Sequence, residues 1–538
     1  MKWLWIDAIC IDQSNLEERA SQVAMMKDIY SNASGVVIWL GDSDVRLEAA
    51  LVAIYAISKK FQADTGMAAA CIVGPDGLRL DPTSIEHLQS YGLFEILSNT
   101  PENIYKLLAH LFALPWFRRV WVLQEAFAHS KITVRLGEHK LPWGSVILAA
   151  LWASGFTRTY TAMSASEHRV ERTIDRGYLP ELWLGLLHTR PVRGLSILEL
   201  VSRARDFEAS DPRDKVFALL GLANDVGAHE SRAAGLRPDY TKTKGEVYAA
   251  FAKDLIMTSG CLDVLALVNT FAPRDQRQDS PSWMPDLDVP IATIRGLGFP
   301  RKYNAGFSTK ADMHHVTGPS DDPRSLMLTG FGVDRVHYVT KSILTFSRNL
   351  KVYIDSTTEA VTELWKTYAR FNRLHASEEA LLYAYIELVT ATGFAMPTAF
   401  PTYPLGRIVP PREVPSIIAD FAAYWSSVEP SFSSFGDRLG SHLRQLAEAA
   451  DAEQFGVLAG KACHERKFFI TAEGRIGLCP TDAQEGDEVV ILYGGSVPYV
   501  LRETGAGCWT FVGECFVDGI MFGEAEKFRR PAQVFHLL

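Results

Sequence analysis

Residues 118–129 read RRVWVLQEAFAH and place a glutamate, Glu125, in an otherwise apolar stretch. If the stretch is helical, Trp121 and Glu125 are one turn apart and lie on the same face. A carboxylate on a face that an indole helps to bury requires an explanation. Either a neighbouring arginine neutralises it, Arg118 and Arg119 being the nearest, or it lines a pocket and takes part in chemistry there. At this point both interpretations stay open.

Local patterns predict the elements that position this segment. The apolar run WLWIDAICI (3–11) contains bulky alternating side chains and predicts a strand. The next residues, SNLE, form a capping-box pattern in which Ser14 and Glu17 begin a helix with apolar residues at three- and four-residue spacing. GVVIWLG (35–41), bounded by glycines, predicts a buried strand. Strand, helix and strand in this order predict a parallel βαβ unit with a right-handed crossover.

The segment around Glu125 is expected to connect two strands of one sheet. Residues 42–100 are predicted to be an insertion, and PENIYKLLAHLFALPWF (101–117) a helix. KITVRLG (131–137) predicts the next strand, so the intervening segment is expected to be helical. In open α/β sheets, ligands bind beyond the carboxyl ends of the strands, where the following helices begin. This position favours the pocket interpretation of Glu125.

The rest of the chain changes character. From about residue 150 to 440 the patterns are mostly helical, as in SDPRDKVFALLGLA (210–223), where Ser210 or Asp211 is the expected cap. From about residue 455, short apolar runs alternate with turn residues, which predicts strands. We therefore predict an α/β domain over 1–150, a mainly helical middle region over 151–450 and a small β-rich domain over 451–538.

Composition excludes several classes of protein. Among 538 residues, 54 lysines and arginines stand against 63 acidic residues, and the net charge of −9 argues against nucleic-acid binding as the main task. No apolar run is long enough to span a bilayer, and Asp7 interrupts the one stretch comparable with a signal peptide. Seven scattered cysteines without a CxxC pair indicate reduced thiols in a cytoplasmic protein. Cys463, His464 and Cys479 lack a fourth ligand at suitable spacing, so no metal site is expected.

Three segments resemble those of a known family. WIDAICIDQSNLEERASQVAMMKDIYSNASGVVIWLG (5–41) and PWFRRVWVLQEAFAHSKITVRLG (115–137) resemble the two signatures of the fungal heterokaryon incompatibility (HET) domain. DPRDKVFALLGL (211–222) resembles the motif that commonly follows them. The carboxyl-terminal β segment is also similar to the one that ends many such proteins. Together these segments cover about half of the chain.

The resemblance implies a fold similar to the Toll/interleukin-1 receptor (TIR) domain, a flavodoxin-like parallel sheet, and a function in non-self recognition and programmed cell death. Trp121 and Glu125 are similar to the W-x-x-x-E element of TIR domains that cleave NAD, in which the glutamate is catalytic. The resemblance therefore implies an NAD glycohydrolase with Glu125 as the catalytic residue, Trp121 shaping the pocket, and NAD as substrate rather than cofactor. Family members usually begin further upstream with a strand carrying a SYxWG-like element, so the first strand is expected to be missing.

A single carboxylate is chemically sufficient for this reaction. Glycosidases ordinarily use two, one of which protonates the leaving oxygen. Nicotinamide leaves NAD as a neutral pyridine, so an ionised glutamate near the ribose needs only to stabilise the developing positive charge. The alternative, from a different class of function, is a non-catalytic signalling module that triggers cell death by self-association or by binding other incompatibility proteins.

Three further residues are candidates for substrate binding. Asp12 either holds a ribose hydroxyl or serves as a loop or cap residue. Arg19 either approaches a pyrophosphate, pairs with Asp12 or faces solvent. Arg119 is close to Glu125 in sequence and belongs to the same candidate pocket. Asp211 and Asp214 are explained by helix capping and local ion pairing.

Overall fold

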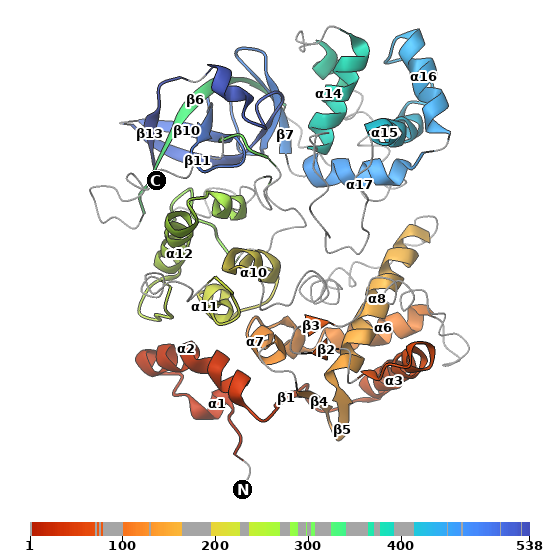
Figure 1. Cartoon of the computed structure of the whole chain (residues 1–538), viewed down its shortest axis with the longest axis vertical. Coiled ribbons are helices and arrows are strands. Elements are labelled where there is room, and N and C mark those ends of the chain that lie inside the picture. The colour runs from red at the N-terminus through yellow and green to blue at the C-terminus, as the bar shows by residue number, and fades with distance from the viewer. Residues whose placement is uncertain are drawn as a thin grey trace. The chain divides into compact units, whose positions relative to one another are not determined.

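The computed structural model describes the greater part of the chain, which forms two compact units. Unit 1 comprises residues 1–244 and 400–408, and unit 2 comprises residues 245–399 and 409–538. Figure 1 labels the helices and strands. None of the described helices is long and apolar enough to cross a membrane. The described residues are 3–69, 73–74, 77–78, 101–127, 131–163, 195–225, 236–268, 280–288, 297, 303–306, 324–340, 364–370, 377–391, 414–448, 450–463, 466–505, 507–528 and 530–538.

The amino-terminal run does not form the predicted strand. Asp7–Cys10 is a short helix, α1, that has no buried residue. The Asp7 carboxylate accepts a hydrogen bond from the amide of Ala8 (2.8 Å), and the Cys10 amide bonds to the Ile6 carbonyl (2.8 Å), so the turn satisfies its own backbone groups. The strand prediction is therefore wrong. The alternation of bulky residues indicated a strand, but a strand requires a paired neighbour, and none pairs with this run among the described residues.

The helix and the two strands predicted after this run are confirmed. Helix α2 (Leu16–Asn32) is capped by Asn15, whose side chain accepts from the amides of Glu17 and Glu18, so the predicted Ser14 cap is wrong. Strand β1 (Val36–Trp39) pairs in parallel with β4 (Ile132–Leu136), and β5 (His139–Pro142) pairs antiparallel with β4. The resulting three-stranded sheet is small and mixed, whereas the resemblance implied a fully parallel sheet.

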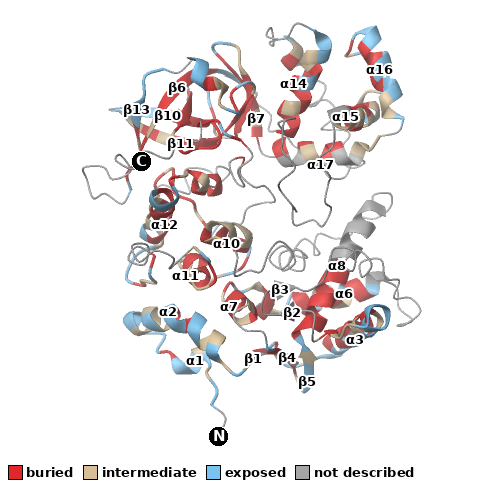
Figure 2. Ribbon diagram, viewed as in Figure 1, coloured by how far each residue is buried: buried red, intermediate tan, exposed pale blue. Residues whose placement is uncertain are grey.

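Helices bury the apolar face of this sheet and form most of the core of unit 1 (Figure 2). Helix α3 contacts both α6 and α8, and α8 also contacts β4. The predicted helix over 101–117 is confirmed in its first part as α6, which is followed by a short 3₁₀ helix. The bounds are α3 (Val45–Thr65), α6 (Pro101–Phe112), the 3₁₀ helix Pro115–Arg118, α7 (Val122–Phe127), α8 (Trp143–Met163), α10 (Ile197–Ala204) and α11 (Asp214–Leu220), with the two-residue strands β2 (Val73–Gly74) and β3 (Gly77–Leu78).

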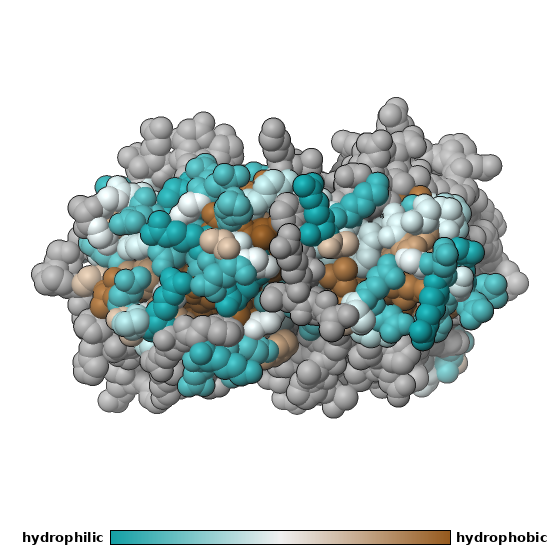
Figure 3. Space-filling view, turned by 90° about the horizontal axis from the view of Figure 1, so that it is seen from above, coloured by the Kyte–Doolittle hydropathy of each residue, from teal (hydrophilic) through white to brown (hydrophobic). Residues whose placement is uncertain are grey.

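Unit 2 contains a group of helices that pack around aromatic side chains. The ring of Trp365 lies 4.9 Å from that of Phe435 and 5.2 Å from that of Tyr385, and Phe421 contacts Trp425 at 5.5 Å. On the face seen in Figure 3, hydrophilic residues alternate with small hydrophobic patches among the coloured residues. Residues 364–370 are helical, and the other described helices of unit 2 are α12 (Lys244–Ser259), the 3₁₀ helix Asp263–Leu267, α14 (Glu378–Thr390), α15 (Val414–Val428), α16 (Asp437–Ala447), α17 (Ala452–Cys463) and the 3₁₀ helix Glu524–Phe528.

The strands of unit 2 form one sheet, and five of them close into a barrel. Strand β6 pairs with β13, then with β9 and finally with β7 along its length. Because β13, β11, β10 and β9 follow one another and β9 returns to β6, these five strands close on themselves. Gly330 allows the close approach of β6 and β9, since a Cβ there would lie 2.2 Å from the Ile491 carbonyl oxygen. The bounds are β6 (Leu326–Val339), β7 (Arg466–Thr471), β8 (Ile476–Pro480), β9 (Glu488–Leu492), β10 (Tyr499–Gly505), β11 (Cys508–Glu514), β12 (Phe516–Val517) and β13 (Gln533–Leu537).

The chain is thus a mixed α/β protein with a small amino-terminal sheet, a helical middle and a β-rich carboxyl-terminal part. The predicted strands beyond residue 455 are confirmed. Strand β5 was not predicted, and β6 was missed because it lies within the region predicted to be helical and finds its partners only far along the chain. The three domain limits given above stay predictions.

Candidate functional site

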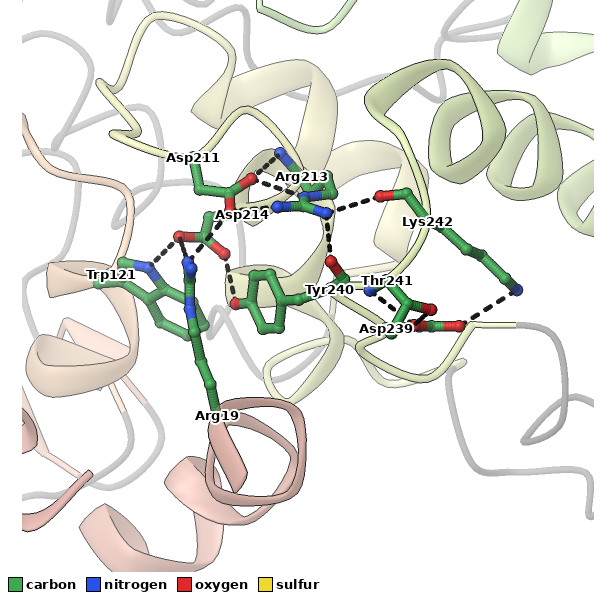
Figure 4. A network of polar contacts seen from close by, with 9 residues as sticks. All are labelled: Arg19, Trp121, Asp211, Arg213, Asp214, Asp239, Tyr240, Thr241 and Lys242. Carbon is green, nitrogen blue, oxygen red and sulfur yellow. Dashed lines mark hydrogen bonds and ion pairs between the residues drawn. The ribbon is translucent and has the colours of Figure 1, made fainter. Parts of the chain in front are cut away.

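Asp214, the first residue of α11, is a buried carboxylate held by three donors. Its relative exposure is only 4%. Trp121 donates its indole N–H to Oδ2 (2.9 Å), and the Tyr240 hydroxyl donates to Oδ1 (2.6 Å). Arg19 adds a charged contact at 3.4 Å, from Nη2 to Oδ2. Both oxygens of this carboxylate are therefore engaged (Figure 4).

A second carboxylate, Asp211, extends the same network. Arg213 binds it in a bidentate manner, with Nε and Nη2 each 2.8 Å from a carboxylate oxygen. Arg19 also reaches Asp211, at 3.3 Å, and its guanidinium lies 3.7 Å from the ring centroid of Tyr240. We call Arg19, Trp121, Asp211, Arg213, Asp214 and Tyr240 the Asp214 cluster.

The pKa values of the two carboxylates of the Asp214 cluster are shifted in opposite directions. Burial raises the pKa of Asp214 above its usual value, and the bonds from Tyr240 and Trp121 offset this only in part. Burial also acts to raise the pKa of Asp211, but the hydrogen bonds from Arg213 outweigh it and the net pKa is lowered. Burial and the nearby Asp214 charge raise the pKa of Tyr240, which keeps its hydroxyl protonated as a donor. The carboxylate with the lowered pKa, Asp211, is thus the one paired with both guanidinium groups, those of Arg19 and Arg213.

The Asp214 cluster joins the regions of helices α2, α7 and α11, and Tyr240 adds a fourth segment that is distant in the sequence. Helix α11 contacts both α2 and α7, and α2 contacts α7. The side chain of Gln124 on α7 is buried and donates to the Ala218 carbonyl of α11 (2.9 Å). A Cβ on Gly221 would lie 2.9 Å from the Cβ of Lys27 on α2, so the helices touch closely at this glycine. Helices α2, α7 and α11 therefore pack into one assembly within unit 1.

Glu125 occupies a different environment from Asp214. Its carboxylate is half-buried and accepts one hydrogen bond, from the indole N–H of Trp116 (2.8 Å). Burial raises its pKa, while Trp116 and the Arg119 charge lower it and the Asp7 charge raises it further. Among the described residues Glu125 makes no ion pair. The ion-pair interpretation of Glu125 is therefore wrong, because Arg118 pairs with Glu208 instead and Arg119 acts on Glu125 through its charge without forming an ion pair with it.

The other predicted site residues fall in separate places. The Asp12 carboxylate is exposed and accepts from the hydroxyl (2.6 Å) and the amide (3.0 Å) of Ser14, which is a loop-turn role. Of the alternatives for Arg19, the pairing with Asp12 is wrong, since Arg19 pairs with Asp211 and Asp214. Arg119 is exposed and acts on Glu125 only through its charge. The structure thus brings Arg19 and Trp121 together at Asp214, and Arg119 near Glu125.

Three residues of this region were missed by sequence reasoning. Trp116 has no periodic relation to Glu125, and Tyr240 lies far from either carboxylate along the chain. Asp214 was attributed to helix capping and local ion pairing. Its ion pair is instead with the distant Arg19, and the N-cap of α11 is Arg213 without a side-chain hydrogen bond, so the expected Ser210 or Asp211 cap is wrong. The available signal was the apolar context of Asp214 in DKVFALL, where a charge needs partners. Within the described ranges, no group of three or more His, Cys, Asp or Glu side chains could hold a metal ion.

Comparisons with known proteins find matches at the two ends of the chain and one relative along most of its length. Residues 1–125 match the family Heterokaryon incompatibility protein (HET), and residues 437–537 match the Het-6 beta-barrel domain. The chain is 25% identical over 588 residues to Heterokaryon incompatibility protein 6, OR allele, of Neurospora crassa, which covers 97% of this chain and 81% of that protein. No solved structure matches the chain.

Proposed function

Since this chain carries a HET domain at its amino end and a Het-6 β-barrel domain at its carboxyl end, we propose that it acts in heterokaryon incompatibility, as a non-self recognition protein that triggers programmed cell death. The observation that carries the proposal is the joint presence of both domains in a chain similar to one incompatibility protein over 97% of its length. We also propose the cytoplasm as its place of action, because the six described cysteines are unpaired thiols.

Controlled expression in a filamentous fungus tests this proposal. A strain that expresses the chain is fused with an incompatible tester strain. We expect the fused cells to lose viability. A matched strain carrying an early stop codon in the same gene provides the control. Equal growth of both kinds of fused cell, across testers of differing incompatibility type, contradicts the proposal.

We further propose that the HET domain cleaves NAD and that Glu125 is its catalytic carboxylate. Water adds to the ribose carbon, the bond to nicotinamide breaks, and the products are ADP-ribose, neutral nicotinamide and a proton. Support comes from the half-buried position of Glu125, its single neutral donor and the parallel pairing of β1 with β4, as in a TIR-like sheet. Arg119 supplies a nearby cation for the phosphates, and Asp12, Arg19 and Trp121 stay proposed binding residues.

The Glu125 environment predicts how activity responds to pH. The ionised carboxylate is the active form, and burial raises its pKa, so activity should fall on acidification at a higher pH than an ordinary glutamate would give. Trp116→Phe removes the donor that lowers this pKa, so the fall of activity on the acid side of the pH–activity curve (its acid limb) should move to still higher pH. The measurement is nicotinamide release as a function of pH.

A matched substitution controls for the loss of aromatic packing at Trp116. Trp143 packs edge-on against Trp116 at 5.9 Å and does not bond to Glu125. Trp143→Phe should therefore leave the acid limb in place. Identical pH profiles for wild type and Trp116→Phe would show that the indole does not act on the catalytic group.

The rival function is a non-catalytic signalling module that acts by self-association or through other incompatibility proteins. The observation that favours it is the engagement of Trp121, whose indole N–H is bound to Asp214 rather than directed to a ligand. In this alternative, Glu125 is a structural residue and cell death does not depend on its charge. The two functions therefore differ in what Glu125→Gln does.

A further inference from the structure

A cysteine, a histidine and a serine lie together in the barrel of unit 2. Cys508 at the start of β11 is directly opposite His536 of β13 in the parallel register. The Cys508 Sγ lies 3.7 Å from Nδ1 of His536, and Nε2 of the same ring lies 2.7 Å from the Ser325 hydroxyl. Cys508 and His536 are half-buried, while Ser325 is buried. The imidazole is thus held between a thiol and a hydroxyl.

This order of groups is that of an activated nucleophile. A nucleophile within reach of a base, with the base oriented by a third group, is the arrangement that generates a reactive thiolate. If Nε2 donates to Ser325, the lone pair of Nδ1 faces the thiol and can accept its proton. The resulting imidazolium keeps an acceptor at each nitrogen, the sulfur at Nδ1 and the hydroxyl at Nε2. Nothing in the HET-domain chemistry uses these residues.

We propose that Cys508 is a reactive thiol that His536 activates and Ser325 orients, and that its substrate class is hydroperoxides. The thiolate attacks one peroxide oxygen, so an S–O bond forms and the O–O bond breaks. Sulfur is oxidised by two electrons to a sulfenic acid, and the peroxide is reduced. His536 returns the thiol proton to the departing hydroxide, which leaves as water when the peroxide is hydrogen peroxide.

The other described cysteines lack this arrangement. Cys463, Cys479 and Cys515 are fully buried, and burial raises the pKa of each thiol, which makes them inert. Cys261 is half-buried like Cys508, but its sulfur contacts the Ser259 carbonyl (3.3 Å) and no imidazole. Cys261 is therefore an internal control of matched exposure.

Two charged side chains lie on the elements that flank the pair. Glu503 lies on β10, opposite Trp509, and Arg324 precedes Ser325 on the approach to β6. Neither Cys508 nor His536 bonds to a charged side chain within the described part of the chain. The imidazole, 3.7 Å from the sulfur, is thus the group expected to govern the reactivity of the thiol.

Site-resolved labelling of the full chain tests the proposal. We expect iodoacetamide at pH 7 to alkylate Cys508 roughly tenfold faster than Cys261, because the thiolate is the nucleophile. Hydrogen peroxide followed by a sulfenic-acid trap should label Cys508 first. Mass spectrometry of the peptides gives both rates, and His536→Gln should bring the Cys508 rate down to that of Cys261.

The variants separate activation from general damage to the barrel. Ser325→Ala should slow Cys508 less than His536→Gln does, because it removes the orienting group and leaves the base. Hydrogen exchange of β11 and β13 shows whether each variant keeps the barrel. Equal rates for Cys508 and Cys261 in the wild type, or an unchanged Cys508 rate in a folded His536→Gln variant, overturn the proposal.

Discussion

Replacing Asp214 by alanine is expected to lower the free energy of opening of the α2–α7–α11 assembly by about 3–5 kcal/mol, the usual cost of breaking a buried ion pair by removing one partner. The substitution removes the acceptor of two donors, Trp121 and Tyr240, and leaves the partly buried Arg19 beside Asp211 alone. Donors left unsatisfied in the interior account for much of the loss. Asp214→Asn keeps one acceptor oxygen and should cost less.

Hydrogen exchange measures this effect where it arises. Amides of residues 16–32, 122–127 and 214–220 should lose protection together in Asp214→Ala, while those of the barrel keep theirs. Asp239→Ala is the matched control, because Asp239 is more exposed and accepts only from the nearby Thr241 and Lys242. It should cost about 1 kcal/mol or less. Loss of protection in α11 alone would mean that the cluster does not join the three segments.

The second large effect is expected at Glu125. Glu125→Gln keeps the shape of the side chain and an acceptor for Trp116, but it removes the negative charge that stabilises the positive ribose in the transition state. Nicotinamide release by the purified chain should fall by about 100-fold or more, the scale seen when one electrostatic stabiliser is removed. The fold should be preserved, since no ion pair of Glu125 is lost.

Glu208→Gln provides the control for this experiment. Glu208 is an exposed glutamate of unit 1 that pairs with Arg118 at the surface. Its substitution should change nicotinamide release little and stability by no more than about 1 kcal/mol. A wild-type chain that releases no nicotinamide, or a Glu125→Gln variant as active as the wild type, contradicts the catalytic role.

Local elements could be predicted where sequence periodicity and packing agree. Helix α2 and strands β1 and β4 follow from apolar spacing, because each has one buried face within its own segment. The strand predicted over 3–11 is wrong because strand formation depends on a neighbouring strand, which no local pattern reveals. Strand β6 was not predicted for the same reason, since its partners follow far along the chain.

The candidate site could be predicted only in part. Glu125 stood out as a charge in an apolar stretch, and its half-buried position agrees with that signal. The partner of each group could not be predicted, because Trp121 meets Asp214 through the packing of α7 on α11, and Glu125 meets Trp116 through a turn rather than a helical repeat. Spacing identifies residues that share a face, whereas tertiary packing decides which donor reaches which carboxylate.

Cellular NAD can be measured after induced expression of the full chain in a filamentous fungus, with cell viability followed in parallel. If Glu125 is the catalytic carboxylate of NAD cleavage, the wild-type chain should deplete NAD before viability falls, and Glu125→Gln, at the same protein level, should preserve both. Cell death by Glu125→Gln at the wild-type rate with NAD unchanged in both cultures would contradict this catalytic role and would leave the non-catalytic signalling module as the function of the HET domain.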